Sequence, residues 1–390
     1  MNSLIQRVWK SRTIKACCSF IALFLLLSIP CSAKVRATVA TNVFKSGYVD
    51  FDSDSSQGMI CWMESTTCRN RGKISPDGSK IAYLQYITPA YFCIEEIKGN
   101  HSTKYYNRPL LNGKQSGFAV SQEWINNDKV CVFFRLKIYG VYPYIYDLSK
   151  DTSYWLVNPC WPLDNRVVWD IEHKRALQHI NGNDLILTDF SSGIPVPKVQ
   201  SILGGTFHYL FRGSSEVVLL GDLSRSFTEF IVPENSSSDA FDSGIILQKT
   251  TGDKAIVGEQ QFVYEIPSTK LIPHQENEIF VKLSPDESKL IYPLEVKNKK
   301  AVEVHIYSFA ANKDILIETV RYESPLELKY YFSKSGQKVY VVNNNEYKVN
   351  KDKTFTKFIR VYDAATGKLM NTLEMTFDKN LVIGDVWSDE

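Results

Sequence analysis

The chain repeats one stretch, Ser75–Tyr83, with the sequence SPDGSKIAY. A second copy, SPDESKLIY, spans Ser284–Tyr292, and a weaker copy, FSKSGQKVY, spans Phe332–Tyr340. Each copy is a tight polar turn followed by an apolar run of β-branched and aromatic residues, which is typical of a turn that leads into a strand. Self-similarity over a long period indicates a repeat architecture, in which each unit stacks on its neighbours to bury its apolar faces.

Similar units of a turn followed by a strand divide the rest of the chain. Seven candidate turns lie about 43 residues apart on average, which is the size of a four-stranded propeller blade. They are Asp77-Gly78, Asn127-Asp128, His173-Lys174, Gly213-Ser214, Gly252-Asp253, Asp286-Glu287 and Ser335-Gly336. The pattern predicts an all-β fold, a β-propeller of about seven four-stranded blades, with six or eight blades as alternatives.

Both ends of the expected propeller carry strand-like runs. Val35–Ala40 lies near the start of the chain and Leu381–Trp387 lies near its end. A ring of blades has to close, so either run can complete a blade that the other end begins. The alternative is that both runs are frayed ends.

The first 33 residues resemble a secretory signal sequence. Basic residues without an acid precede an apolar run, Pro30 interrupts that run, and small residues precede an expected cleavage after Ala33. We therefore expect a signal peptide at 1–33 and a single β-propeller domain at 34–390, in the periplasm or secreted. The alternatives are an uncleaved signal, which is the only membrane contact that we expect, and lipidation at Cys31.

The charge balance argues against nucleic acid as a partner. The full chain has a formal net charge of +2, and removal of the four basic residues of the signal leaves about −2. Charges of both signs are interspersed along the remainder. Such a surface lacks the basic stripe that nucleic-acid-binding proteins present to phosphates.

Eight cysteines are present, and five of them lie beyond residue 33. In an oxidising compartment such cysteines tend to pair. Cys61 and Cys68 flank a short polar loop and form the favoured disulfide. Cys93 and Cys131, in strand-like runs one blade apart, form a second candidate pair, and Cys160 is the expected unpaired thiol.

The repeat resembles that of TolB-type propellers and of the propeller domains of prolyl-oligopeptidase-like enzymes. In the last unit, Lys338–Asn343 followed by Ile359–Leu369 is similar to YVTN and quinoprotein-like repeats. The resemblance covers three units, about a third of the chain, and implies a propeller fold. It does not choose a function, because these repeat residues build turns and pack between blades.

Catalytic and metal-binding patterns are weak in this sequence. It contains no Gly-x-Ser-x-Gly nucleophile elbow, and its six histidines show no metal-ligand spacing. Asp50, Asp52 and Asp54 resemble the start of a calcium loop, but Ser55 and Cys61 replace the glycine and the bidentate glutamate that such a loop requires. We therefore expect no catalytic residue, no cofactor and no metal.

Tyrosines are unusually dense between Tyr139 and Asp147. Strand alternation places Tyr142, Tyr144 and Tyr146 on one face. Such a face packs between blades or, with Tyr139, forms an exposed surface that binds a peptide or a sugar. We interpret it as packing and keep the binding surface as the alternative.

These observations favour an exported, non-catalytic propeller that binds a protein or peptide at one mouth of its central channel. The alternative is an enzyme of the propeller lactonase or quinoprotein-like kind, with ligands gathered from several blades at that channel. Three or more Asp, Glu, His or Asn side chains that converge on one point would favour the enzyme. A broad mouth with exposed aromatic residues would favour binding.

Overall fold

The structure of the protein is a computed structural model, and its described residues form strands and turns only. They are residues 34–41, 46–51, 59–62, 72–85, 91–98, 101–109, 117–136, 140–157, 167–180, 184–191, 196–202, 207–213, 216–222, 243–249, 260–266, 270–271, 281–297, 299–321, 327–378 and 381–390. Among these residues, no helix is long and apolar enough to cross a membrane. The predicted all-β fold is confirmed.

The strands of the described residues form seven sheets, which we call blades 1 to 7. Blade 1 contains β4 (Lys73–Ile74), β5 (Lys80–Gln85), β6 (Tyr91–Lys98) and β7 (His101–Pro109). Blade 2 contains β8 (Gly117–Asn126), β9 (Lys129–Leu136), β10 (Gly140–Asp147) and β11 (Thr152–Trp155). Blade 3 contains β12 (Val167–Asp170), β13 (Arg175–Ile180), β14 (Asp184–Asp189) and β15 (Val196–Ile202).

The second half of the ring follows the same antiparallel plan. Blade 4 contains β16 (Phe207–Arg212), β17 (Glu216–Asp222), β18 (Ser243–Lys249) and β19 (Gln260–Ile266). Blade 5 contains β20 (Lys270–Leu271), β21 (Lys282–Leu283), β22 (Lys289–Val296), β23 (Ala301–Ser308) and β24 (Lys313–Arg321). Blade 6 contains β25 (Leu328–Phe332), β26 (Lys338–Asn343), β27 (Lys348–Val349), β28 (Phe355–Asp363) and β29 (Leu369–Phe377).

Blade 7 joins the two ends of the chain. It contains β30 (Leu381–Ser388) as well as β1 (Val35–Thr41), β2 (Ser46–Phe51) and β3 (Met59–Trp62). β1 pairs with β30 along its whole length, from Val35 opposite Ser388 to Thr41 opposite Leu381. The apolar side chains of both strands belong to one buried cluster with those of blade 6. The prediction that the two terminal runs complete one blade is confirmed.

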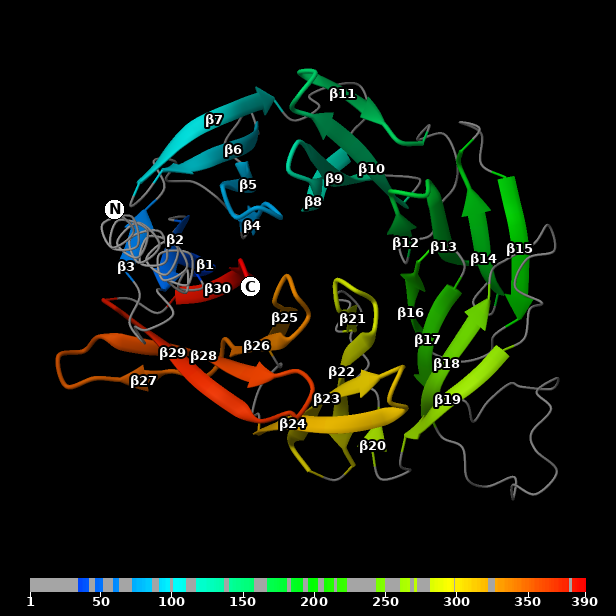
Figure 1. Ribbon diagram of the computed structural model, residues 1–390. Coiled ribbons are helices and arrows are strands. Elements are labelled where there is room, and N and C mark those ends of the chain that lie inside the picture. The colour runs from blue at the N-terminus through cyan, green and yellow to red at the C-terminus, as the bar shows by residue number, and fades with distance from the viewer. Residues whose placement is uncertain are drawn as a thin grey trace, which may run out of the picture.

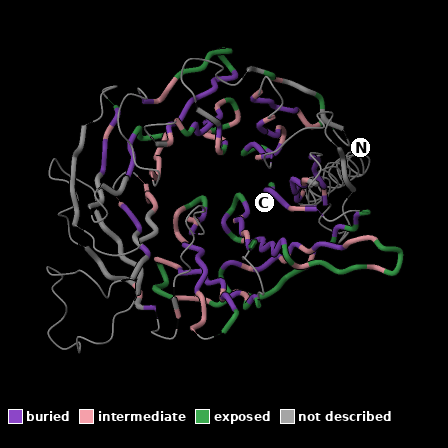
Figure 2. The backbone as a smooth tube through the Cα atoms, turned by 180° about the vertical axis from the view of Figure 1, so that it is seen from behind, coloured by how far each residue is buried: buried purple, intermediate pink, exposed green. Residues whose placement is uncertain are grey.

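The blades follow one another around a closed ring, with one edge strand of each blade nearest the axis (Figure 1). These inner strands include β4, β8, β12, β16, β21, β25 and β30. Buried segments gather in the inner and middle strands of the blades (Figure 2). The arrangement is a β-propeller, and the count of seven agrees with the predicted number of units.

One of the predicted turns does not mark a blade of its own. Gly252-Asp253 lies outside the described residues, and the strands on either side of it, β18 and β19, pair with each other in blade 4. Blade 4 already contains the turn near Gly213 between β16 and β17. The seventh blade is formed instead by strands from the two ends of the chain, and none of the candidate turns marks it.

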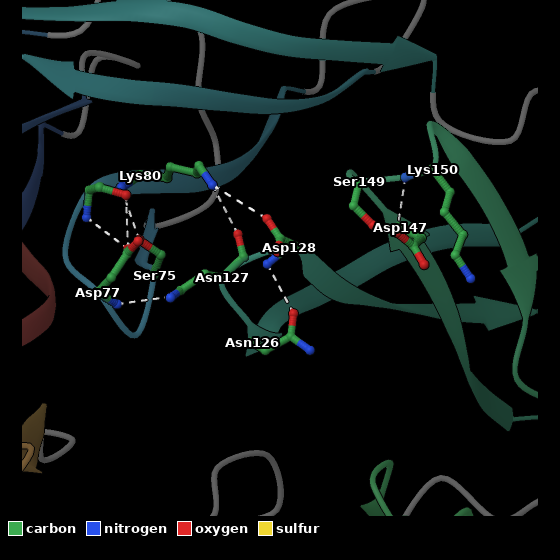
Figure 3. A network of polar contacts seen from close by, with 10 residues as sticks. Ser75, Asp77, Lys80, Asn126, Asn127, Asp128, Asp147, Ser149 and Lys150 are labelled. Atoms are coloured by element: carbon green, nitrogen blue, oxygen red, sulfur yellow. Dashed lines mark hydrogen bonds and ion pairs between the residues drawn. The ribbon is translucent and has the colours of Figure 1, made fainter.

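The repeated motif forms its turn through side-chain hydrogen bonds. In blade 1 the hydroxyl of Ser75 accepts a hydrogen bond from the Lys80 amide at 2.9 Å and donates one to Asp77 at 2.6 Å (Figure 3). The carboxylate of Asp77 also accepts the Ser79 amide at 3.0 Å. The residue that ends the turn, Gly78, has a φ of +73°, which suits glycine because it has no Cβ.

Cationic side chains connect most blades to the next blade in the ring. Lys80 of blade 1 donates to the Asn127 carbonyl of blade 2 at 3.0 Å (Figure 3), and Lys289 of blade 5 donates to the Gly336 carbonyl of blade 6 at 3.3 Å. The other pairs are Arg36 with Gly78, Arg175 with Gly213, Arg212 with Glu287, and Lys338 with Glu390. Within the described residues, this cationic belt spans six of the seven junctions between blades.

Candidate functional site around the ring axis

The predicted disulfides fall into two groups. Cys61 lies in β3, but its side chain and Cys68 lie outside the described residues, so that disulfide stays a prediction. Cys160 also lies outside them. The pairing of Cys93 with Cys131 is wrong. Both are buried thiols, and they pack in different clusters, because Cys93 faces Tyr48 of blade 7 while Cys131 faces blade 3.

The tyrosine segment packs inside the ring. Tyr142, Tyr144 and Tyr146 are 0%, 8% and 2% exposed, and Tyr139 lies outside the described residues. The Tyr146 ring stacks on Phe92 of blade 1 with 4.3 Å between centroids. The alternative of an exposed binding surface is therefore wrong for these three residues, because the face that they share lies against the neighbouring blade.

The structure bears on one of the two features that would separate a binding protein from an enzyme, the convergence of metal-ligating side chains. Within the described part of the chain, no group of three or more His, Cys, Asp or Glu side chains could hold a metal ion. Asp50 of the considered calcium loop pairs instead with Lys34 at 2.9 Å and Arg36 at 2.5 Å, and Asp52 and Asp54 lie outside the described residues.

Three lysines on inner strands come together around the axis, and we call them the axial lysine cluster. Lys73 lies on β4, Lys282 on β21 and Lys329 on β25, so they come from blades 1, 5 and 6. Asp385 of β30 and Glu123 of β8 are the carboxylates that act on Lys282 together with the other two lysines. The site therefore combines three ammonium groups with two carboxylates.

The pKa of Lys282 is strongly perturbed by its surroundings. Burial lowers its pKa to about 8 from 10.5, and the ammonium groups of Lys73 and Lys329 act in the same direction. Asp385 and Glu123 oppose that shift without cancelling it. Like charges gathered on a partly buried wall favour the entry of an anion, which relieves their repulsion.

Tyr331 holds the Lys282 side chain in place. The Lys282 Nζ atom lies 4.4 Å from the centroid of the Tyr331 ring, which is a cation–π distance. The Tyr331 hydroxyl donates a hydrogen bond to the Gly384 carbonyl of β30 at 2.7 Å. Blade 6 thus positions a lysine of blade 5 and is itself fixed to blade 7.

Asp385 is already engaged on its own side of the axis. One carboxylate oxygen accepts the Ile74 amide at 3.0 Å, and the other lies 3.6 Å from the Lys73 Nζ atom. Lys282, by contrast, has no ion pair or hydrogen bond to another described residue, and its contact is with the Tyr331 ring. It is therefore the ammonium of this cluster that a ligand can most easily satisfy.

The sequence carries a signal for this cluster beside the turns of the repeat. Lys73 and Lys282 each lie two residues before the serine that begins the two strong copies of the motif. Those positions fall on the short inner strands β4 and β21. In the weaker copy, Tyr331 occupies the same place. Equivalent positions of a propeller repeat lie around the same axis, so recurrent lysines there predict a charged site.

A second buried charged group lies away from the axis, in blade 5. His305, which is 2% exposed, lies between two carboxylates, with Nδ1 2.8 Å from Asp314 and Nε2 3.1 Å from Glu303. Glu303 also pairs with Lys270 at 2.7 Å, and Asp314 accepts the Tyr292 hydroxyl at 2.8 Å. Burial works against ionisation of Glu303 and Asp314, but these hydrogen bonds outweigh it and lower the pKa of both carboxyls. Each charge already has a partner, so we interpret this group as a structural cross-link.

Comparison with solved structures supports the fold. The chain is similar to a periplasmic gluconolactonase from Pseudomonas aeruginosa, with 11% identity, 91% of this chain and 98% of that chain covered, and a TM-score of 0.50. It is also similar to TolB from Acinetobacter baumannii (14% identity, coverage 94% and 84%, TM-score 0.47) and to an oligogalacturonate lyase from Vibrio parahaemolyticus (11%, 87% and 84%, 0.48).

These likenesses bear on architecture alone, because identities this low do not carry function. Neither a protein-family model nor a curated protein matches the sequence. A shared propeller fold at such an identity does not choose between catalysis and binding. The resemblance to TolB-like propellers is confirmed at the level of the fold.

Proposed function

We propose that the protein is an exported, non-catalytic propeller that binds a protein or peptide, with an acidic group of that partner at the axial lysine cluster. The observation that carries the proposal is the convergence of Lys73, Lys282 and Lys329 from three blades around the axis. A carboxylate placed there accepts charge-assisted hydrogen bonds from ammonium groups that otherwise repel one another.

The placement of the cluster suits a binding protein. The inner strands belong to a ring that the cationic belt and the β1–β30 pairing hold together, so the lysines start from a preorganised arrangement. Preorganisation reduces the entropy that a ligand must offset on binding. A peptide carboxylate, from the C-terminus or from Asp and Glu side chains, has the charge to pair with these ammonium groups.

The test is a binding measurement with matched charge removal. Fluorescence polarisation would compare a panel of acidic peptides with the same peptides after amidation of their carboxylates. We expect the acidic forms to bind more tightly and the affinity to fall as salt rises, because screening weakens such contacts. The triple variant Lys73→Gln, Lys282→Gln, Lys329→Gln should lose most of this preference.

A control variant removes the same charge elsewhere. Lys348, Lys351 and Lys368 are exposed residues of blade 6, and their replacement by Gln should leave binding unchanged. Equal loss in both triple variants would mean that net charge, and not the axial cluster, attracts the peptides. Turnover of lactones that a chelator abolishes would instead support the enzyme of the lactonase kind.

Export is a separate part of the proposal and has its own measurement. N-terminal sequencing of the protein from a secreting host should begin near Lys34. Mass measurement with and without reductant should reveal a disulfide between Cys61 and Cys68. A full-length N-terminus in the cytoplasm, or thiols at both of these cysteines after export, would contradict it.

A further inference from the structure

The part of blade 6 that lies farthest from the axis forms a hairpin of its own. β28 pairs with β26 only through residues 360–363, and the start of β28 pairs instead with the short strand β27, with Val349 opposite Phe355. We call residues 347–355 the β27–β28 hairpin. It lies at the outer margin of the ring, where Figure 1 draws it in orange and Figure 2 shows exposed positions along it. A surface at that margin is open to a partner outside the ring.

One face of the β27–β28 hairpin is apolar and partly exposed. Strand alternation and cross-strand pairing place Tyr347 and Val349 on the face of Phe355. The Tyr347 and Phe355 rings lie 5.7 Å apart between centroids. Phe355 is in turn opposite Phe377 of β29, which is buried in the cluster that blades 6 and 7 share. Tyr347 and Val349 are the outer end of this apolar row, and they are 45% and 58% exposed.

The same hairpin carries positive charge on a fixed turn. Its exposed lysines are Lys348, Lys351 and Lys353. The Asn350 amide donates to the Thr354 carbonyl at 2.9 Å, which closes the turn. The acidic residue of the turn, Asp352, accepts the Thr354 amide at 3.1 Å and the Thr354 hydroxyl at 2.7 Å. The hairpin therefore holds three ammonium groups beside two exposed apolar side chains in a preorganised turn.

We propose that the β27–β28 hairpin docks on the surface of an anionic membrane. Tyr347 and Val349 enter the interface, and the three lysines contact the lipid phosphates. Tyrosine is a side chain that lies at the level of the headgroups, and lysines near an anionic surface add electrostatic attraction. This contact is separate from residues 1–33, where the sequence places the expected membrane contact.

The size of the site favours a membrane over a protein partner. A stable protein interface takes about 800 Å² from each partner, with a buried apolar centre. The hairpin offers two exposed apolar side chains on a narrow turn, which is much less. A lipid surface accepts a few apolar anchors with basic residues beside them, and it has no shape that the protein must match.

Sedimentation with lipid vesicles tests the proposal. The full chain is mixed with vesicles of phosphatidylcholine, or of equal parts phosphatidylcholine and phosphatidylglycerol, and we expect binding to the second kind. The triple variant Lys348→Gln, Lys351→Gln, Lys353→Gln should bind on the order of tenfold more weakly. The double variant Tyr347→Ser, Val349→Ser should lose a similar factor, because it removes the apolar anchors. Every variant contains residues 1–33, so any contribution of that segment is common to all of them.

Another hairpin of the chain provides a matched control. The turn between β22 and β23 also carries three lysines, Lys297, Lys299 and Lys300. Among its described residues, no large apolar side chain is exposed, and Ala301 is buried. Replacement of these three lysines by Gln should reduce vesicle binding far less. Hydrogen exchange of the wild-type chain needs no variant: amides of residues 347–353 should gain protection on anionic vesicles, and those of residues 299–301 should not.

Equal loss of binding in the two lysine variants would mean that net charge alone attracts the vesicles, and it would overturn the proposal. Absence of binding to anionic vesicles, or binding that both variants of the β27–β28 hairpin retain, would do the same. The proposed function is tested separately, because its peptide measurements contain no lipid and probe the inner strands. Peptide binding without vesicle binding would reject the membrane contact alone, and vesicle binding without peptide binding would reject the proposed function alone.

Discussion

Blades 1 and 3 build the same turn from different side chains. In blade 1 the Gly78 amide donates to the Ser75 carbonyl at 2.8 Å, and in blade 3 the Lys174 amide donates to the Ile171 carbonyl at 3.3 Å. Both turns end on a residue with positive φ, +73° at Gly78 and +53° at Lys174. Asp170 replaces the Ser-Pro-Asp capping of blade 1, since its carboxylate accepts the His173 amide at 3.1 Å.

The two turns also differ in how they meet the next blade. Lys80 of blade 1 is paired with Asp128, whose side chain is 62% exposed, at 3.9 Å. Arg175 of blade 3 contacts Asp170, whose side chain is 11% exposed, at 2.7 Å, and donates to the Gly213 carbonyl. The Ser-Pro-Asp-Gly sequence is therefore one of several sets of side chains that stabilise this turn conformation. In blade 3, which lacks that sequence, the turn depends more on the buried ion pair between Arg175 and Asp170.

The largest expected effect comes from breaking that ion pair. Arg175→Met leaves the carboxylate of Asp170 without its guanidinium partner in a site that is mostly buried. We expect the free energy of unfolding to fall by about 3 kcal/mol. Chemical denaturation monitored by circular dichroism measures this loss.

The matched variant in blade 1 is Lys80→Met. Asp128 remains solvated there, so the expected loss is about 1 kcal/mol. Equal losses for the two variants would contradict the claim that blade 3 relies more heavily on its cationic link.

The next effect in size concerns the glycine of the blade 1 turn. A Cβ on Gly78 would lie 2.5 Å from the Trp387 ring, and the φ of +73° is unfavourable for any other residue. Gly78→Ala should cost about 2 to 3 kcal/mol, because it adds both overlap and backbone strain. Thermal unfolding measures the change.

Gly213 is the control for this prediction. Its φ is +54°, but a Cβ there meets only the end of the Glu287 side chain at 3.4 Å. Gly213→Ala should therefore show the backbone cost alone, about 1 kcal/mol. A smaller loss at Gly78 than at Gly213 would argue against close packing of Trp387 on the turn.

Acid sensitivity is expected at the Ser-Pro-Asp turn of blade 5. Burial opposes ionisation of Asp286, but hydrogen bonds from Ser284 and Ser288 outweigh it and lower its pKa from 3.8 to about 2. The contribution of Asp286 is thus present above pH 3.8 and lost as the pH falls toward 2. Because Asp286 is exposed, screening limits it to about 0.5–1 kcal/mol.

The variant Asp286→Asn tests this dependence. Its deficit in the free energy of unfolding at pH 7 should shrink as the pH is lowered through that window. A deficit that stays constant down to pH 2 would show that the carboxylate charge plays no part in the turn.

The smallest expected effect is a gain. Glu287 occupies, in blade 5, the position of Gly78 and has a φ of +56°. Glu287→Gly removes strain but adds freedom to the unfolded chain, so we expect a net stabilisation of about 0.5 kcal/mol. Lys174→Gly in blade 3 should behave alike. Destabilisation by both changes, measured by thermal unfolding, would mean that these side chains stabilise the turn more than their backbone strain costs.

Much of the fold could be predicted because the residues of the repeated motif form their hydrogen bonds with one another, within a few positions along the chain. Ser75 and Ser284 cap their turns through contacts within five residues, so the pattern is visible in sequence. The prediction of a separate unit at Gly252-Asp253 is wrong, because turn residues alone do not reveal which strands pair. The closing blade followed from the requirement that a ring must close, and not from any motif.

The candidate site was less accessible to sequence reasoning. Lys73, Lys282 and Lys329 are far apart in the chain, and their proximity depends on the curvature of the ring. The pairing of Cys93 with Cys131 failed for the same reason. Strand alternation shows that two side chains point out of a sheet, but not which neighbouring blade each one faces.

The pairing of β1 with β30 also sets the order in which the molecule can assemble. During synthesis, β1 leaves the ribosome more than 300 residues before its partner strand exists. Its partner edge, with Val35, Ala37 and Val39 beside it, stays uncovered for that time. Contacts between such distant segments form slowly, and an open strand edge invites pairing with other chains. The last step of folding is therefore also the step at which aggregation competes most strongly.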